Sequence, residues 1–162
     1  MPEQKVASSA GSSRAGLLSS LSESELQALL AGAKRRPFRK DENILIQGQS
    51  NASLFVLVEG LLHVVRTAGG KQVFLGRLEA GALFGELSLF DPGPTTAAVH
   101  AAEDGVLIEI SRACLDTFVA QHPTAGIDLL RRLLHDVAHR LRGADERLTE
   151  AVVWGGLLRG AR

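Results

Sequence analysis

A series of short apolar segments separated by glycines, from Arg35 to Ser111, decides which folds are open to this chain. The segments are apolar, β-branched or alternating, and each of them therefore predicts a strand. We expect six strands: Ile44–Gln47, Leu54–Glu59, Leu61–Thr67, Lys71–Leu78, Thr95–Ala101 and Val106–Ile110. Ala68-Gly69-Gly70 lies between two of these segments and predicts a hairpin. Short strands at near-regular spacing favour a β-sandwich or β-barrel over a parallel sheet.

Helical patterns flank this strand region. Leu17 to Ala33 has a helical pattern, and Ser22 followed by Glu25 has the spacing of a capping box, which satisfies free backbone donors at a helix start. Ser111 is placed to cap a second, short helix that runs through Gln121 and ends at the His122-Pro123 step. The chain is therefore predicted to be mainly β with helices on both sides of the strand region.

A regular apolar seam marks the last predicted helix, residues 124–151. Its members follow a strict three-four spacing: Ile127, Leu130, Leu134, Val137, Leu141, Ala144, Leu148 and Ala151. This is the heptad period that supercoils two helices around each other, and a symmetric homodimer is the simplest source of the second helix. Alternatively, the stripe packs only on the chain's own β-domain. Leu129 and Leu133 lie off the seam and are available for that packing, so we favour the dimer.

The segment Gly85-Glu86-Leu87-Ser88 is predicted to open a single helical turn. Backbone N–H groups at the start of such a turn have no internal partner and point outward, which favours binding of an anion. Gly85 is expected to let a ligand approach the backbone, and Glu86 to accept hydrogen bonds from sugar hydroxyls. The turn therefore predicts an anion-binding site.

Three motifs resemble the cyclic nucleotide-binding domain family, over roughly Leu17 to Ala151. Leu54-Phe-Val-Leu-Val-Glu-Gly60 is similar to a strand of that family that ends in glycine. Gly81 to Val99 is similar to its phosphate cassette, with matching loop length, and Ala138-His-Arg-Leu141 to the middle of its C-terminal helix. The resemblance is greatest to the sensor half of bacterial catabolite activator-type regulators.

The resemblance implies a fold and a ligand. The fold is an eight-stranded β-roll, or jelly-roll-like barrel, with an N-terminal helix and a long C-terminal dimerisation helix, and the ligand lies between the roll and that helix. The ligand is cyclic AMP, cyclic GMP or a related phosphate-containing molecule, and no other cofactor is expected. Glu86 would bind the ribose 2′-hydroxyl. The cyclic phosphate would be held by the amides of Gly85, Leu87 and Ser88, with Thr96 and Ala97 across the pocket.

Thr95 departs from the family pattern, because it stands where the family has an arginine that pairs with the cyclic phosphate. A charge-assisted hydrogen bond contributes roughly 1.5–3 kcal/mol. At about 1.4 kcal/mol for each factor of ten, its loss weakens binding of cyclic AMP or cyclic GMP by about ten- to hundredfold. Arg66, Arg77 and Arg140 are candidates for a substitute cation, and their spacing does not choose among them. We expect cyclic nucleotide binding to be weak or lost.

Two further departures lie near the C-terminal end. Catabolite activator-type sensors read the adenine with two adjacent hydroxyl residues on the long helix, and this chain has Ala144 and Asp145 there. Such regulators continue into a helix-turn-helix domain, whereas this sequence stops at Arg162 and leaves nothing for a recognition helix. We expect Trp154 and its neighbours to cap the coiled coil or to bind a protein partner.

Composition limits the remaining classes. Eighteen basic residues balance eighteen acidic ones, so the chain has no bias towards nucleic acid or an anionic membrane. No apolar run approaches membrane-spanning length, and the N-terminus lacks the long apolar stretch of a secretory signal. The single cysteine, Cys114, excludes an internal disulfide and suits a reducing compartment. We expect a cytoplasmic protein that binds neither nucleic acid by itself nor a membrane.

Weaker signals have simpler explanations than function. Lys34 to Lys40 carries five basic residues in seven, and a charged edge strand protected by Pro37 explains them better than a nucleic-acid patch. His135 and His139 have the spacing of a zinc-protease helix, but no third ligand follows in the sequence, which favours a solvated face. No Ser/His/Asp group or paired carboxylate has a motif-like context, so neither an enzyme nor a metal site is predicted.

Taken together, the patterns predict a mobile tail at 1–16, a cyclic nucleotide-binding-like domain at 17–151 that includes the helix 124–151, and a C-terminal tail at 152–162. The predicted function is a cytoplasmic regulatory module that senses a ligand and transmits its binding through the dimer helix. The alternative is a homodimeric protein-interaction module that needs no ligand and whose pocket is vestigial.

Overall fold

The computed structural model describes Leu18 and residues 20–159; of residue 148 and residues 151–159 it describes the backbone alone. The tail predicted at 1–16 lies outside the described residues. The chain divides into two compact units, of which the first ends at Leu129 and the second begins at Leu130. Each unit is described by itself below.

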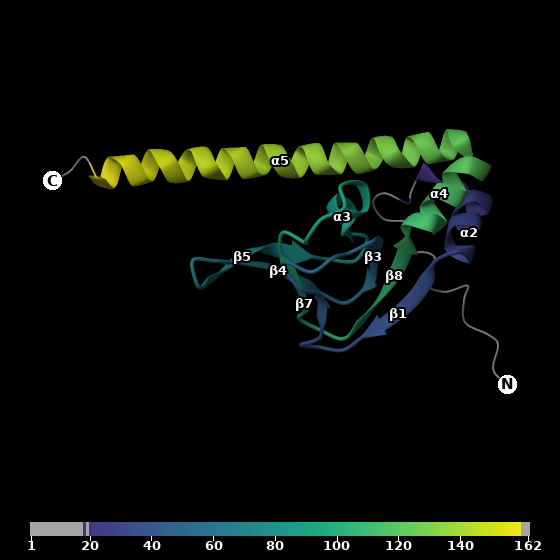
Figure 1. Ribbon diagram of the computed structural model, residues 1–162, viewed down its shortest axis with the longest axis horizontal. Coiled ribbons are helices and arrows are strands. Elements are labelled where there is room, and N and C mark those ends of the chain that lie inside the picture. The colour runs from purple at the N-terminus through teal and green to yellow at the C-terminus, as the bar shows by residue number, and fades with distance from the viewer. Residues whose placement is uncertain (1–17, 19, 160–162) are drawn as a thin grey trace. The chain divides into compact units, whose positions relative to one another are not determined.

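The first unit contains eight strands in two antiparallel sheets of four strands each (Figure 1). One sheet has the order β1 (Lys34–Phe38), β8 (Gly105–Ser111), β3 (Ser53–Glu59) and β6 (Leu83–Phe84). The other has the order β2 (Asn43–Leu45), β7 (Ala98–Ala101), β4 (Leu62–Ala68) and β5 (Lys71–Leu78). The mainly β, jelly-roll-like fold with flanking helices is confirmed, and the two sheets are not closed into a barrel. The structure adds β6 to the six strands predicted from apolar patterns and to the charged edge strand predicted at Lys34 to Lys40, which is β1.

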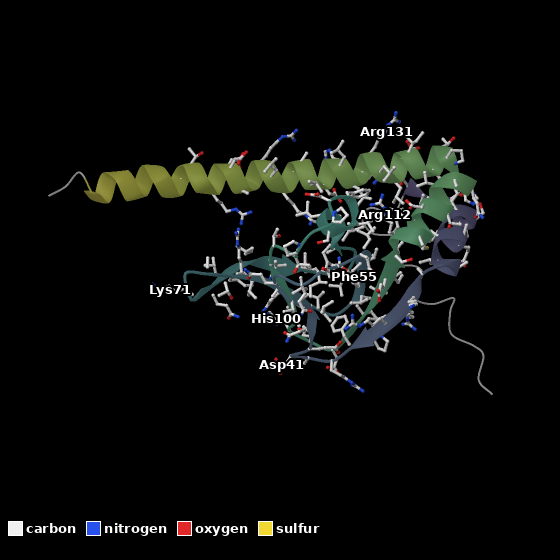
Figure 2. The ribbon with its side chains drawn as sticks, in the orientation of Figure 1. Asp41, Phe55, Lys71, His100, Arg112 and Arg131 are labelled. Carbon is white, nitrogen blue, oxygen red and sulfur yellow. The ribbon has the colours of Figure 1, made fainter. Side chains whose placement is uncertain are left out.

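The hydrophobic core lies between the two sheets, because both contribute buried side chains to one cluster. The phenyl rings of Phe55 and Phe84 stack there with their centroids 5.2 Å apart, and Figure 2 shows Phe55 in the interior of the first unit. The cluster consists of Phe38, Ile44, Phe55, Leu57, Leu62, Phe84, Val99, Ala101 and Leu107. Leu57, Leu62 and Leu107 are fully buried, which is the contribution that most stabilises a small domain.

Two short helices begin where the sequence places their caps. Helix α2 spans Glu23–Ala31, with the Ser22 amide donating to Glu25 Oε2 at 2.8 Å and the Glu25 amide donating to Ser22 Oγ at 3.4 Å. The capping box is confirmed, although α2 starts at Glu23 rather than at Leu17. Helix α4 spans Arg112–Gln121 with Ser111 as its N-cap, and it packs beside α2 (Figure 1).

The basic segment predicted to be an edge strand is β1, at the edge of its sheet. Pro37 is paired with Val106 of β8, and its missing N–H is tolerated in an edge strand. Arg36 forms an ion pair of 2.7 Å with Glu42, and Arg39 one of 3.0 Å with Asp104. Part of the basic charge therefore pairs with local carboxylates.

The second unit consists of most of helix α5, which spans Pro123–Arg159. It follows α4 after His122, as the His122-Pro123 step predicts, and it continues beyond residue 151, where the seam pattern ends. None of the described helices is both long and apolar enough to cross a membrane.

Asp104 supplies a test of local electrostatics. Its carboxylate accepts from the Lys40 amide at 2.8 Å and from Arg39 Nη1 at 3.0 Å, and the amide bond foremost holds the pKa of Asp104 below its ordinary value. A lowered folded-state pKa stabilises the fold above the unfolded value of about 3.9, and this stabilisation is lost as pH falls through the folded value.

We therefore expect Asp104→Ala to lower the free energy of unfolding at pH 7, with the difference from the unmodified protein shrinking as pH falls below about 4. Urea unfolding at a series of pH values measures this. Glu103→Ala, which removes the same charge from the adjacent exposed residue, is the control and should show little difference. A deficit of Asp104→Ala that persists unchanged below the folded pKa would contradict the assignment.

Candidate ligand-binding cassette

The segment predicted to bind phosphate forms a strand-helix-loop-strand unit, which we call the cassette (residues 81–99). It begins with β6, continues through helix α3 (Glu86–Phe90) and a loop at 91–97, and enters β7. The single helical turn predicted at Gly85–Ser88 is present as the start of α3. Helix α3 contacts β3, so the cassette lies against the central part of the first sheet.

Gly85 is required by the packing of the cassette on β3. Its backbone has φ +83°, a left-handed conformation that side chains rarely adopt. A Cβ atom at this position would lie 2.8 Å from the Ser53 carbonyl oxygen and 3.0 Å from Phe55 Cδ2. Asn51 Nδ2 closes this side by donating to the Gly85 carbonyl at 3.2 Å and to the Ser53 carbonyl at 2.7 Å. The structure thus gives a different reason for the glycine from the ligand approach expected from the sequence.

The residues of α3 separate into a buried and an exposed set. Glu86 is only 5% exposed although it carries a carboxylate, and Leu89 is buried with it. Leu87 and Phe90 are about half exposed, and Ser88 lies between these extremes. Burial of a carboxylate is costly unless it is hydrogen-bonded or paired, so Glu86 is a structurally demanding choice at this position. Glu86 is the first residue of α3, and the helix dipole stabilises a negative charge at that end.

Thr95 is buried and ties the cassette loop to a neighbouring turn. Its hydroxyl donates to the Ile46 carbonyl at 2.6 Å, and its amide donates to the Gln49 carbonyl at 2.9 Å. The Thr95 carbonyl in turn accepts from the Gly48 amide at 2.8 Å. Three hydrogen bonds from one residue therefore fix the loop on residues 46–49, which we call the latch turn.

Two further side chains hold this arrangement in place. Gln47, in the latch turn, bonds both backbone groups of Thr67 in β4: the Thr67 amide donates to Oε1 at 2.7 Å, and Nε2 donates to the Thr67 carbonyl at 3.1 Å. Arg112, at the start of α4 (Figure 2), donates to the Leu89 carbonyl at 2.8 Å and so anchors α3. The cassette is fixed at its helix and at its loop by neutral backbone acceptors.

The predicted site residues fall into both units. Gly85 is the N-cap of α3, Glu86, Leu87 and Ser88 lie on the helix, and Thr95, Thr96 and Ala97 follow in the loop of the same cassette. Thr96 is exposed and Ala97 half-buried. Ala144 and Asp145 lie on α5 in the second unit, and both are exposed. Of the candidate substitute cations, Arg77 forms an ion pair of 3.0 Å with Glu79.

The predicted seam on α5 carries exposed leucines. Leu134 and Leu141 are 69% and 61% exposed, whereas Leu129 and Leu133, off the seam, are buried. The remaining seam residues range from half-buried to exposed: Ile127, Leu130, Val137 and Ala144. The side chain of Leu148 lies outside the described residues. His135 and His139 are exposed, as expected for a solvated face.

The chain matches the profile of a known protein family. The profile of the family described as "Cyclic nucleotide-binding domain" matches residues 35–122, which is more than half of the chain and includes both sheets and the cassette. The chain belongs to the cyclic nucleotide-binding domain family. The resemblance seen in the sequence is therefore confirmed.

Curated relatives of this domain include bacterial regulators. The cyclic AMP receptor protein of Thermus thermophilus is 32% identical over 80% of this chain and 58% of its own length. The CRP-like cAMP-activated global transcriptional regulator of Mycobacterium tuberculosis is 27% identical over 86% of this chain and 61% of its own length. The chain spans about three fifths of the length of these relatives.

Solved structures agree with the fold. The catabolite activator protein of Thermus thermophilus superimposes with a TM-score of 0.75 at 30% identity, over 84% of this chain and 62% of its own. A cyclic nucleotide-binding domain from Methylobacillus flagellatus gives a TM-score of 0.76 at 24% identity, over 86% of this chain and 79% of its own, and supports the fold alone.

Three residues that position the cassette are not predicted by any sequence pattern: Gln47, Asn51 and Arg112. Each acts by a side-chain bond to the backbone of a segment that is distant in sequence or irregular in structure. Such bonds leave no periodic pattern, and only a residue-by-residue comparison with relatives would have singled them out.

Replacing Thr95 by Val tests whether its hydroxyl holds the latch turn. The change keeps the shape of the side chain but removes the donor to the Ile46 carbonyl, which retains the Gln49 amide at 3.2 Å as a partner. We expect the free energy of unfolding to fall by about 1 kcal/mol, measured by urea denaturation. Thr96→Val, at the exposed neighbour, should change it by less than about 0.5 kcal/mol. Equal effects of the two substitutions would contradict the latch.

Proposed function

We propose that this chain is the ligand-sensing module of a regulator, that it binds a cyclic nucleotide or a related phosphate-containing molecule, and that its affinity for cyclic AMP and cyclic GMP is low. The observation that carries the proposal is the position of Thr95. Family membership and the names of the cAMP-responsive relatives support the ligand class. The hydroxyl of Thr95 bonds within the protein, and it is neutral where the family has a cation.

Within the module, we assign the ligand contacts to the cassette. The amides of Gly85, Leu87 and Ser88 face the phosphate together with Thr96 and Ala97, and Glu86 accepts from the ribose 2′-hydroxyl. An amide cluster at a helix start supports such binding, because its N–H groups have no partner within the helix. The purine base meets Ala144 and Asp145, which lack the paired hydroxyls of the family and therefore select poorly for adenine.

We propose that the module spans residues 17–151, between tails at 1–16 and 152–162, and that it forms a homodimer through α5. The exposure of Leu134 and Leu141 supports this, since two large apolar side chains one heptad apart are left uncovered on one helix. Ligand binding would shift the population of helix arrangements in the dimer. The single cysteine suits the reducing cytoplasm, where we expect the protein to act.

The second candidate function is a homodimeric interaction module that needs no ligand and binds a protein partner at its Trp154 end. The latch favours this candidate, because Thr95 fixes the cassette loop through bonds that require no ligand. In neither proposal does the chain act as an enzyme, bind nucleic acid by itself or enter a membrane.

Restoring the missing cation tests the ligand assignment. We expect Thr95→Arg to tighten cyclic AMP binding by about ten- to hundredfold, because the guanidinium adds a charge-assisted hydrogen bond to the phosphate. Isothermal titration calorimetry measures the affinity. The matched control is Thr96→Arg, which adds the same charge one residue away and should not reproduce the gain. No gain in Thr95→Arg, with the fold intact, would show that the loop does not bind phosphate as proposed.

Placing charge in the seam tests the dimer. Leu134→Lys with Leu141→Lys should give a monomer by light scattering, since two lysines in each helix would lie buried against their counterparts in the seam. The control is His135→Lys with His139→Lys, which adds the same charges on exposed positions of α5 outside the seam. Dimerisation that survives the leucine substitutions would rule out the seam as the interface.

A further inference from the structure

Two histidines lie side by side on the outer face of the sheet β2-β7-β4-β5. His63 of β4 is paired directly with His100 of β7. Their sequence neighbours Leu62, Val99 and Ala101 belong to the core, so the histidines point to the opposite face. Directly opposed residues in antiparallel strands have Cβ atoms about 4.5–5.5 Å apart. Two imidazoles at this separation can bind one metal ion.

The orientation of each imidazole is already constrained. Nδ1 of His100 is hydrogen-bonded to Oδ1 of Asn43 in β2. An amide oxygen only accepts, so in the neutral form of the ring Nδ1 carries the hydrogen and Nε2 carries the lone pair. Metal-binding histidines are oriented in this way, by donating their other N–H to an oxygen. The ring of His63 stands perpendicular to that of Phe74, with the centroids 5.3 Å apart.

A hollow of about 430 Å³ lies over the two rings, lined by Lys40, Asp41, His63, Gln72 and His100 together with Ala101 and Ala102. Figure 2 shows His100 and Asp41 on the same side of the first unit. Asp41 has φ +66° and donates its amide to the Ala101 carbonyl at 2.8 Å, which fixes the turn beside the sheet. The Lys40 side chain opposes a cation, but it is exposed and flexible enough to extend into solvent.

We propose that His63 and His100 bind a divalent transition-metal ion of the borderline class, such as Cu²⁺, Ni²⁺ or Zn²⁺. Imidazole suits these ions, with Cu²⁺ bound most tightly, whereas Mg²⁺ and Ca²⁺ prefer oxygen ligands. Among the described residues, no group of three or more His, Cys, Asp or Glu side chains is placed to hold a metal. Water or an external ligand therefore completes the coordination sphere, so that the bound ion keeps coordination positions open to solvent.

The bound ion would connect β4 to β7, the strand that directly follows the cassette loop. This site is separate from the proposed phosphate contacts and does not depend on them. Its test must also account for His135 and His139, because a spacing of one helical turn on the exposed face of α5 also suits binding of an added metal ion.

The experiment uses the untagged chain of residues 1–162 carrying His135→Gln and His139→Gln, titrated with CuCl₂, NiCl₂ and ZnCl₂ by calorimetry. We expect binding of one ion per chain, with no heat from MgCl₂. Adding His63→Gln or His100→Gln should weaken binding at least tenfold, and adding Asn43→Leu by a similar factor through loss of the ring's orientation. Unchanged affinity in the His63 and His100 variants would overturn the site.

A second measurement needs no substitution and covers the case in which a variant fails to fold. In the unmodified protein, Cu²⁺ should broaden the NMR amide signals of Val64 and Val99 at substoichiometric concentration, because these residues adjoin the two histidines. Broadening confined to residues around His135 and His139 would place the ion on α5 and overturn the proposal.

Discussion

The burial of β3 on both faces is the constraint on which the first unit depends. Its residues Leu54 to Val58 form a continuous apolar run rather than an alternating one, and all are buried. Phe55 and Leu57 enter the core between the sheets. Helix α3 also contacts β3. Because β3 is closely covered, the cassette can pass only where its backbone lacks a side chain, and this fixes Gly85.

The cassette then inherits its conformation from neutral hydrogen bonds. Asn51 holds its start, Arg112 holds the carbonyl of Leu89, and Thr95 holds its loop. Apart from Arg112, the donors carry no charge. A net contribution of about 1 kcal/mol for each bond is enough for three bonds to hold a short loop in one conformation. The loop is thus held through groups of the protein itself.

The sequence predicted those features that repeat or that follow local chemistry. The strands predicted between Leu54 and Leu78 and at Val106–Ile110, the capping box of Ser22 and the hairpin at Gly69-Gly70 are present, because alternation, cap spacing and glycine turns each leave a local pattern. Of the strand predicted at Thr95–Ala101, only Ala98–Ala101 forms a strand, β7. Strand β6 has only two residues, which is too short for an alternating pattern of apolar residues. Strand β1 is indicated by its run of basic residues and not by such a pattern. The role of Gln47, which pairs with Thr67 across twenty positions, has no sequence signature.

The same distinction explains why the site was predicted in outline only. The glycine and the acidic residue of the cassette are recognisable from their order, but the reason for Gly85 is its distance from Ser53, which no local pattern contains. Likewise, the sequence shows that Thr95 lacks a charge. It does not show that the hydroxyl bonds to Ile46. The sequence shows that a threonine stands at position 95. Only the fold shows the hydrogen bond that its hydroxyl makes.

In the proposed sensor, this bond bears on signalling. A ligand can shift a conformational equilibrium only by its difference in affinity for the two states. The hydrogen bonds of Thr95 to residues 46–49 order the loop through the protein's own groups. A loop that is held in this way offers a ligand little to rearrange. Within the proposed function, a bound cyclic nucleotide would therefore act on the dimer mainly through contacts outside this loop, and the proposal implies weak coupling between ligand and dimer.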